Sequence, residues 1–84
     1  MTIATEMIAR LSALEPTRLE VTDESESHRG HAGFREGGQT HFRILMATPA
    51  FAGLSRIERH RLVHATLGDI VPRIHALALE LAES

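Results

Sequence analysis

The sequence predicts an α+β fold, a small domain in which the elements follow the order helix, strand, strand, helix, strand. Two segments repeat apolar residues at helical spacing, whereas two others alternate polar and apolar residues, as half-buried strands do. The chain has 84 residues, of which 43% are hydrophobic, and no linker divides it. We therefore treat residues 1–84 as a single domain with one modest core.

The first half of the chain predicts a helix followed by two strands. Apolar residues recur at helical spacing over residues 3–14, and Pro16 closes this run. Residues 18–23 alternate and predict a strand. Residues 39–48 alternate as well, and they predict a second strand with three apolar side chains on one face: Phe42, Ile44 and Met46.

The second half contains a helix with clear boundaries. Ser55 and Glu58 form the S-x-x-E pattern of a capping box, which predicts a helix over residues 55–67. Gly68 is suited to end the helix, and Pro72 opposes its continuation. An amphipathic helix at this position can pack on the two strands.

Residues 73–82, "RIHALALELA", fit two structures. Alanine and leucine favour a helix, but the leucines alternate with smaller or polar residues, as in a strand. A third strand would cover an open sheet edge, so we predict a strand. A strand that returns after a helix normally runs parallel to the previous strand. His75 then lies at the sheet end where the second strand begins.

The long connection between the first two strands reaches the same end of the sheet. Its sequence, "ESESHRGHAGFREGG", carries His28 and His31 among several glycines. Long connections in small domains are often functional. We expect His28, His31 and His75 to converge there, although each could instead be an ordinary solvated or half-buried histidine. We expect His41 to face solvent or to pack beside Arg43.

The composition narrows the possible functions. The chain contains no cysteine, so it supplies neither a disulfide nor a thiolate. Its net charge of −2 gives no overall attraction for nucleic acid. It has no apolar run that could cross a bilayer and no secretion signal, so we expect a cytoplasmic protein without membrane contact.

The sequence favours a protein without catalytic residues and without a small-molecule substrate. Asp23, Ser25 and His28 contain the residue types of a catalytic triad. A connection rich in serine and glycine, however, cannot hold a nucleophile in position. We therefore predict that the protein is not an enzyme.

Five short motifs give the chain a resemblance to a known family. They run in order from about residue 3 to residue 81: "DES" at 23–25, "THFR" at 40–43, "FAG" at 51–53, "RHRLVHA" at 59–65 and "IHALAL" at 74–79. Together they resemble the BolA family. The resemblance implies a class II KH-like fold, with a three-stranded mixed sheet and both helices packed on one face. It also implies that the GxxG loop of nucleic-acid-binding KH domains is missing.

The resemblance further implies partnership with a monothiol glutaredoxin, with which family members share a [2Fe-2S] cluster in iron sensing or iron–sulfur cluster trafficking. The histidine of the HALA motif is one ligand and corresponds to His75. The second ligand lies in the connection between the first two strands, where His28 fits and His31 is a rival. The partner's cysteine and glutathione supply the thiolates.

The resemblance implies a second activity, transcriptional regulation by DNA binding. A basic cluster on helix 55–67 and directly after it suits this alternative, because arginines can bind phosphates. The lack of aromatic residues for stacking on bases weakens this alternative, and so does the net negative charge. The candidate residues are Arg56, Arg59, His60, Arg61 and Arg73.

Overall fold

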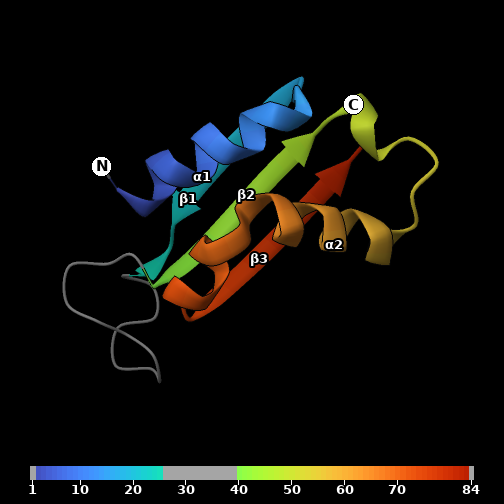
Figure 1. Ribbon diagram of the computed structural model, residues 1–84. Helices are drawn as coiled ribbons and strands as arrows, with labels where there is room; N and C mark the ends of the chain where they lie inside the picture. Colours follow the sequence, from blue (N-terminus) through green and yellow to red (C-terminus); the bar gives the residue numbers. More distant parts are fainter. Residues whose placement is uncertain (1, 26–39, 84) are drawn as a thin grey trace.

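The computed structural model describes residues 2–25 and 40–83, and it confirms the predicted α+β fold (Figure 1). The elements follow the predicted order: α1 (Ile3–Leu11), β1 (Arg18–Asp23), β2 (His41–Ala47), α2 (Arg56–Leu67) and β3 (Ala76–Ala82). Short 3-10 turns follow α1, precede α2 and link α2 to β3. Within the described residues, no helix is long and apolar enough to cross a membrane.

The three strands form one mixed sheet in the order β1-β2-β3. β1 runs antiparallel to β2, and β2 runs parallel to β3. The register pairs His41 with Ala76 and Ala47 with Ala82. Residues 76–82 are therefore a strand, as alternation and the open edge predicted, whereas helix propensity alone would have been misleading. The beginnings of β2 and β3 lie at the same end of the sheet, also as predicted.

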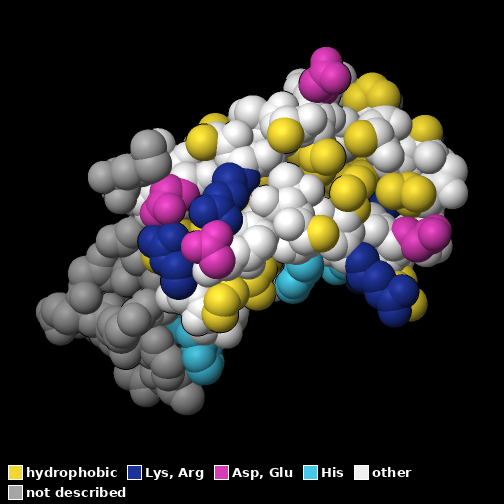
Figure 2. All heavy atoms as spheres, viewed as in Figure 1, with side chains coloured by type: hydrophobic (Ala, Val, Ile, Leu, Met, Phe, Trp, Pro, Cys, Tyr) yellow, Lys and Arg dark blue, Asp and Glu magenta, His cyan; other side chains and the backbone are white. Residues whose placement is uncertain are grey.

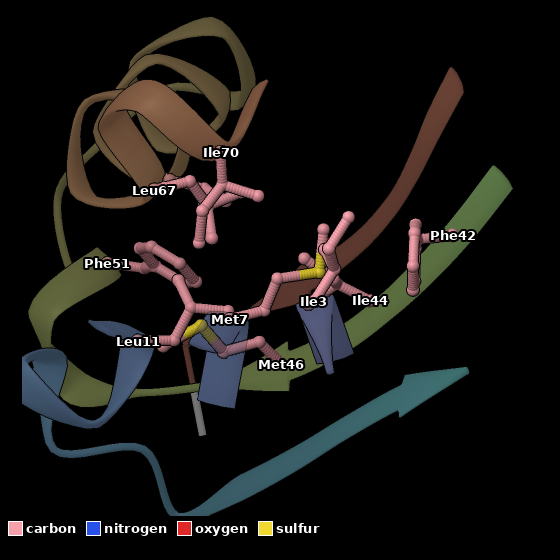
Figure 3. Packing of buried hydrophobic residues seen from close by; sticks show 10 residues of the cluster. Ile3, Met7, Leu11, Phe42, Ile44, Met46, Phe51, Leu67 and Ile70 are labelled. Atoms are coloured by element: carbon pink, nitrogen blue, oxygen red, sulfur yellow. The ribbon is translucent and has the colours of Figure 1, made fainter. Parts of the chain in front are cut away.

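The core lies between one face of the sheet and the two helices (Figure 3). Phe42, Ile44 and Met46 of the central strand are buried on this face. The helices cover it from the same side, which confirms the predicted layer arrangement (Figure 1). Buried residues from outside the sheet complete the cluster: Ile3, Met7, Leu11, Phe51, Val63, Leu67 and Ile70.

The opposite face of the sheet carries charged and small side chains. Arg43 lies at its centre, 3.0 Å from Glu24 and 3.9 Å from Glu80. On β1, Arg18 pairs with Glu20 at 2.6 Å. On β3 the same face carries mainly alanine, and Glu80 is its charged residue. No helix of the described chain covers this face (Figure 1).

The helix ends show which sequence signals were reliable. Ser55 and Glu58 form both hydrogen bonds of the predicted capping box. Gly68 ends α2 with a φ of +56°, a conformation that favours glycine. α1, however, ends at Leu11 and continues as a 3-10 turn to Leu14. The Thr48 hydroxyl donates to the Leu14 carbonyl at 2.6 Å, a tertiary contact that fixes this turn.

Two ion pairs connect the helical elements to each other and predict how stability depends on pH. Arg73 holds the pKa of Glu6 below its usual value by hydrogen bonding, and Arg10 does the same for the pKa of Asp69. A lowered folded-state pKa stabilises the fold above the ordinary carboxyl pKa, and this contribution is lost as the pH falls through the lowered value. We expect the melting temperature to decrease when the pH is lowered below about 4.5, the ordinary pKa of glutamate.

Thermal unfolding between pH 7 and pH 3 tests this expectation. The Arg73→Gln variant removes the partner of Glu6, so its melting temperature should depend less steeply on pH in the acid range. An acid profile identical to that of the unchanged protein would show that the Glu6 pair contributes nothing.

Candidate functional site

His75 lies exposed at the end of the sheet where β3 begins. Its backbone N–H donates to the Thr40 carbonyl at 2.8 Å, and the N–H of Ala76 donates to the same oxygen at 3.1 Å. These two bonds fix the start of β3 against the start of β2. In Figure 2, a histidine side chain is visible at this end of the molecule. The backbone is therefore anchored while the imidazole stays accessible.

His41 is buried, so it does not face solvent, which was one of the two expectations for it. Only 4% of it is exposed. Its ring centroid lies 5.1 Å from that of His75, with the ring planes tilted by 52°. Its Nδ1 is hydrogen-bonded to the Thr40 hydroxyl at 2.8 Å. Strand alternation placed His41 on the open face correctly, but it could not show that His75 lies against it.

Ser25 joins the two ends of the connection between β1 and β2. Its Oγ accepts hydrogen bonds from the backbone N–H groups of Thr40 at 2.9 Å and His41 at 3.2 Å. The same hydroxyl donates to the Asp23 carboxylate at 2.5 Å. Ser25 is only 1% exposed. Asp23 and Ser25, which looked like parts of a triad, thus have a structural role.

Of the three histidines predicted to converge, the structure describes only His75. His75 lies where predicted, whereas His28 and His31 lie outside the described residues. Ser25 and Thr40, which flank residues 26–39, lie at the same sheet end as His75. Sequence reasoning missed the roles of Thr40 and His41, although both lie in the quoted "THFR" motif.

The accessible imidazole of His75 is a possible metal ligand. A neutral imidazole is a good ligand for iron. Within residues 2–25 and 40–83, no group of three or more His, Cys, Asp or Glu side chains is arranged to hold a metal ion. The described side chains therefore offer His75 as one accessible donor, and further donors would have to come from residues 26–39 or from another molecule.

Two of the five candidate nucleic-acid-binding residues have structural partners. Arg59 donates to the Leu54 carbonyl, pairs with Glu83 at 3.0 Å and lies 6.0 Å from the centre of the Phe51 ring. Arg73 forms two hydrogen bonds to Glu6. Both arginines connect segments that are distant in the sequence, and their positive charges are paired with glutamates of this chain.

The other three candidates lie together on the outer surface of α2. Arg56, His60 and Arg61 line a shallow hollow with Ile57 and His64. Ile57 is 62% exposed. In the part of the chain that the structure describes, Arg56 and Arg61 form no hydrogen bond or ion pair with another side chain. Figure 2 shows arginine and histidine side chains close together in the region of α2.

The fold and the site define a class of protein. It is a small α+β domain with two helices on one face of a mixed sheet, and it presents a backbone-anchored histidine at one sheet end. A family model described as BolA-like protein matches residues 11–84. The chain belongs to the BolA-like protein family.

Individual relatives and solved structures agree with this assignment. The chain is 43% identical over 74 residues to a Sinorhizobium protein named "Uncharacterized protein in cobS 5'region", covering 86% of this chain and 80% of that protein. It is 42% identical over 69 residues to bovine BolA-like protein 1, covering 81% of this chain and 48% of the relative. The BolA domain of SufE1 from Arabidopsis thaliana superposes with a TM-score of 0.83 at 34% identity, covering 95% of this chain and 90% of that structure.

A bacterial relative has a more specific name. The DNA-binding transcriptional regulator BolA of Escherichia coli is 36% identical over 69 residues, which cover 81% of this chain and 62% of that protein. The chain thus spans about half to two thirds of the bovine and Escherichia coli relatives. It spans 19% of SufE-like protein 1 from Arabidopsis thaliana, to which it is 41% identical.

Proposed function

We propose that this protein is a partner of a monothiol glutaredoxin and shares a [2Fe-2S] cluster with it, in iron sensing or iron–sulfur cluster trafficking. The observation that carries the proposal is the accessible imidazole of His75, whose backbone is anchored to Thr40 at the sheet end where Ser25 and Thr40 lie. The absence of cysteine from the chain agrees with a ligand set in which a partner supplies the thiolates.

In this proposal the chain contributes imidazoles and positions them. His75 is the first ligand, and His28 or His31 is the second. Thr40 holds the backbone of His75, and the buried ring of His41 packs against the imidazole of His75. Imidazole ligands in place of thiolates raise the reduction potential of a [2Fe-2S] cluster. They also make cluster binding depend on pH, because a protonated imidazole cannot coordinate iron.

The test mixes the apo protein with cluster-loaded monothiol glutaredoxin under anaerobic conditions. We expect the visible circular dichroism of the cluster to change, and we expect the complex to co-purify with iron and sulfide. His75→Ala should abolish the spectral change. His64→Ala removes an exposed histidine from α2 and should leave the change intact. An unchanged spectrum with the original protein, or an equal response from His75→Ala, would contradict the proposal.

The same assay distinguishes the two candidates for the second ligand. His28→Ala and His31→Ala each remove one imidazole while keeping His75. The variant that alters the spectrum of the mixed complex identifies the ligand. If neither variant alters the spectrum, the expectation of a second ligand from this connection is wrong.

A second candidate function is DNA binding in transcriptional regulation. The name of the Escherichia coli relative supports it, as do Arg56 and Arg61, which line the hollow on α2 and form no hydrogen bond or ion pair with another described side chain. The net charge of −2 opposes it. Retention on duplex DNA should fall with salt and should weaken for Arg61→Glu more than for Arg18→Glu, the same charge change on β1. Retention that neither salt nor Arg61→Glu alters would reject this function.

A further inference from the structure

β3 is an edge strand whose outer side has no neighbouring strand among the described residues (Figure 1). The Ala76 N–H donates to the carbonyl of Thr40, which directly precedes β2. The Ala82 carbonyl accepts from the N–H of Thr48, which directly follows β2. Alternate residues of a strand direct their backbone groups to opposite sides. The even-numbered residues of β3 therefore bond to β2, and the N–H and C=O groups of three residues point outward: Leu77, Leu79 and Leu81.

This edge has few of the features that usually prevent edge-to-edge pairing. Its sequence is "ALALELA", with Glu80 as its charged residue and no proline or lysine. The other edge strand, β1, carries Arg18, Glu20 and Asp23 within six residues. Charged residues and proline are common means of protecting an edge. β3 is therefore the edge more suited to pair with another strand.

The β3 sequence is complementary to itself in an antiparallel arrangement. A two-fold axis at Leu79 places Leu77 opposite Leu81 and Ala76 opposite Ala82. It also places Ala78 opposite Glu80, so the glutamates of two copies do not face each other. Each leucine of this strand is only half-buried, so leucine pairs across the axis would remove further apolar surface from water.

A hollow of about 880 Å³ lies at the carboxyl end of β3 and the start of α2, and residues of all three strands line it together with Leu54 and Arg56. Isologous pairing uses the same surface on both copies, as in most dimers.

We propose that a second copy of this chain pairs with β3 in antiparallel orientation about Leu79, so that two three-stranded sheets become one continuous sheet. The occupant follows from the sequence of the edge, which pairs leucine with leucine and alanine with alanine and keeps the two glutamates apart. This association does not depend on the glutaredoxin partnership and uses different side chains.

Ala78 provides the decisive test, because it lies on the open face opposite Glu80 of the second copy. Ala78→Glu creates two like-charge contacts by symmetry, and we expect about tenfold weaker self-association. Within one chain, Ala78 pairs in register with Arg43. The introduced carboxylate lies beside Arg43, which already pairs with Glu24 and Glu80, so thermal unfolding of the variant must show that the monomer is still folded.

The double variant Ala78→Glu/Glu80→Lys places opposite charges across the proposed axis and should restore association. Ala9→Glu makes the same change in net charge on the exposed side of α1 and should have no effect. Sedimentation equilibrium at concentrations up to about 1 mM measures the association constants, because an interface of this size is expected to be weak.

Three results would overturn the proposal. They are a monomeric original protein over this concentration range, equal association of Ala78→Glu and Ala9→Glu, and failure of the double variant to recover. Folding of each variant is verified by thermal unfolding. Ala78→Glu should still respond to cluster-loaded glutaredoxin, so this experiment and the test of His75 fail independently.

Discussion

Replacing Phe51 with alanine is expected to remove a large fraction of the free energy of unfolding. Phe51 is fully buried and packs among residues from both helices (Figure 3). Removing a buried phenylalanine side chain costs about 3–5 kcal/mol, because the protein no longer gains from burying its apolar surface and a cavity remains in the core. A domain of this length has a total stability of about 4–13 kcal/mol, so the loss is a large fraction of it.

Urea unfolding followed by far-ultraviolet circular dichroism measures this effect. Ile57→Ala is the matched control, because Ile57 is an exposed apolar residue on α2. We expect it to change the free energy of unfolding by less than about 0.5 kcal/mol. If both variants lost the same stability, the 3-10 turn that carries Phe51 would not belong to the core.

Replacing Ser25 with alanine is expected to cost about 2–4 kcal/mol, because the backbone N–H groups of Thr40 and His41 lose their acceptor. The Thr40 N–H is paired inside the protein, so alanine leaves it without a partner where water enters poorly. The substitution also separates the ends that the hydroxyl joins beside His75. We therefore expect the response to glutaredoxin to weaken in the same variant.

Urea unfolding gives the cost, and amide hydrogen exchange shows where it arises. The amides of Thr40 and His41 should exchange faster in Ser25→Ala, while those in the middle of β2 should keep their protection. Ser12→Ala removes an exposed hydroxyl that bonds to Ile8 within α1 and should have little effect. Unchanged exchange at Thr40 would contradict the role assigned to Ser25.

Local signals in the sequence predicted most of the fold. The capping box at Ser55, the glycine at position 68 and the alternation around Ile44 depend on neighbouring residues, so they are visible in the sequence. The third strand required an argument about the whole sheet, because the alanines and leucines of residues 76–82 suit both a helix and a strand.

The site was less predictable because its contacts join distant segments. His75 could be placed from the expected parallel pairing, but the burial of His41 depends on a ring that is 34 positions away. Arg73 looked like part of a basic cluster until Glu6, at the other end of the chain, was seen to bind it. No local spacing pattern reports such partners.

The parallel pairing of β2 and β3 has a consequence for how the protein matures. β1 and β2 are neighbours without an intervening helix, whereas β3 is connected to β2 through α2. Contacts between segments far apart in sequence tend to form late and slowly. We therefore expect His75 to meet Thr40 and His41 late in folding, and a chain in which β3 has not yet paired with β2 does not present the anchored imidazole.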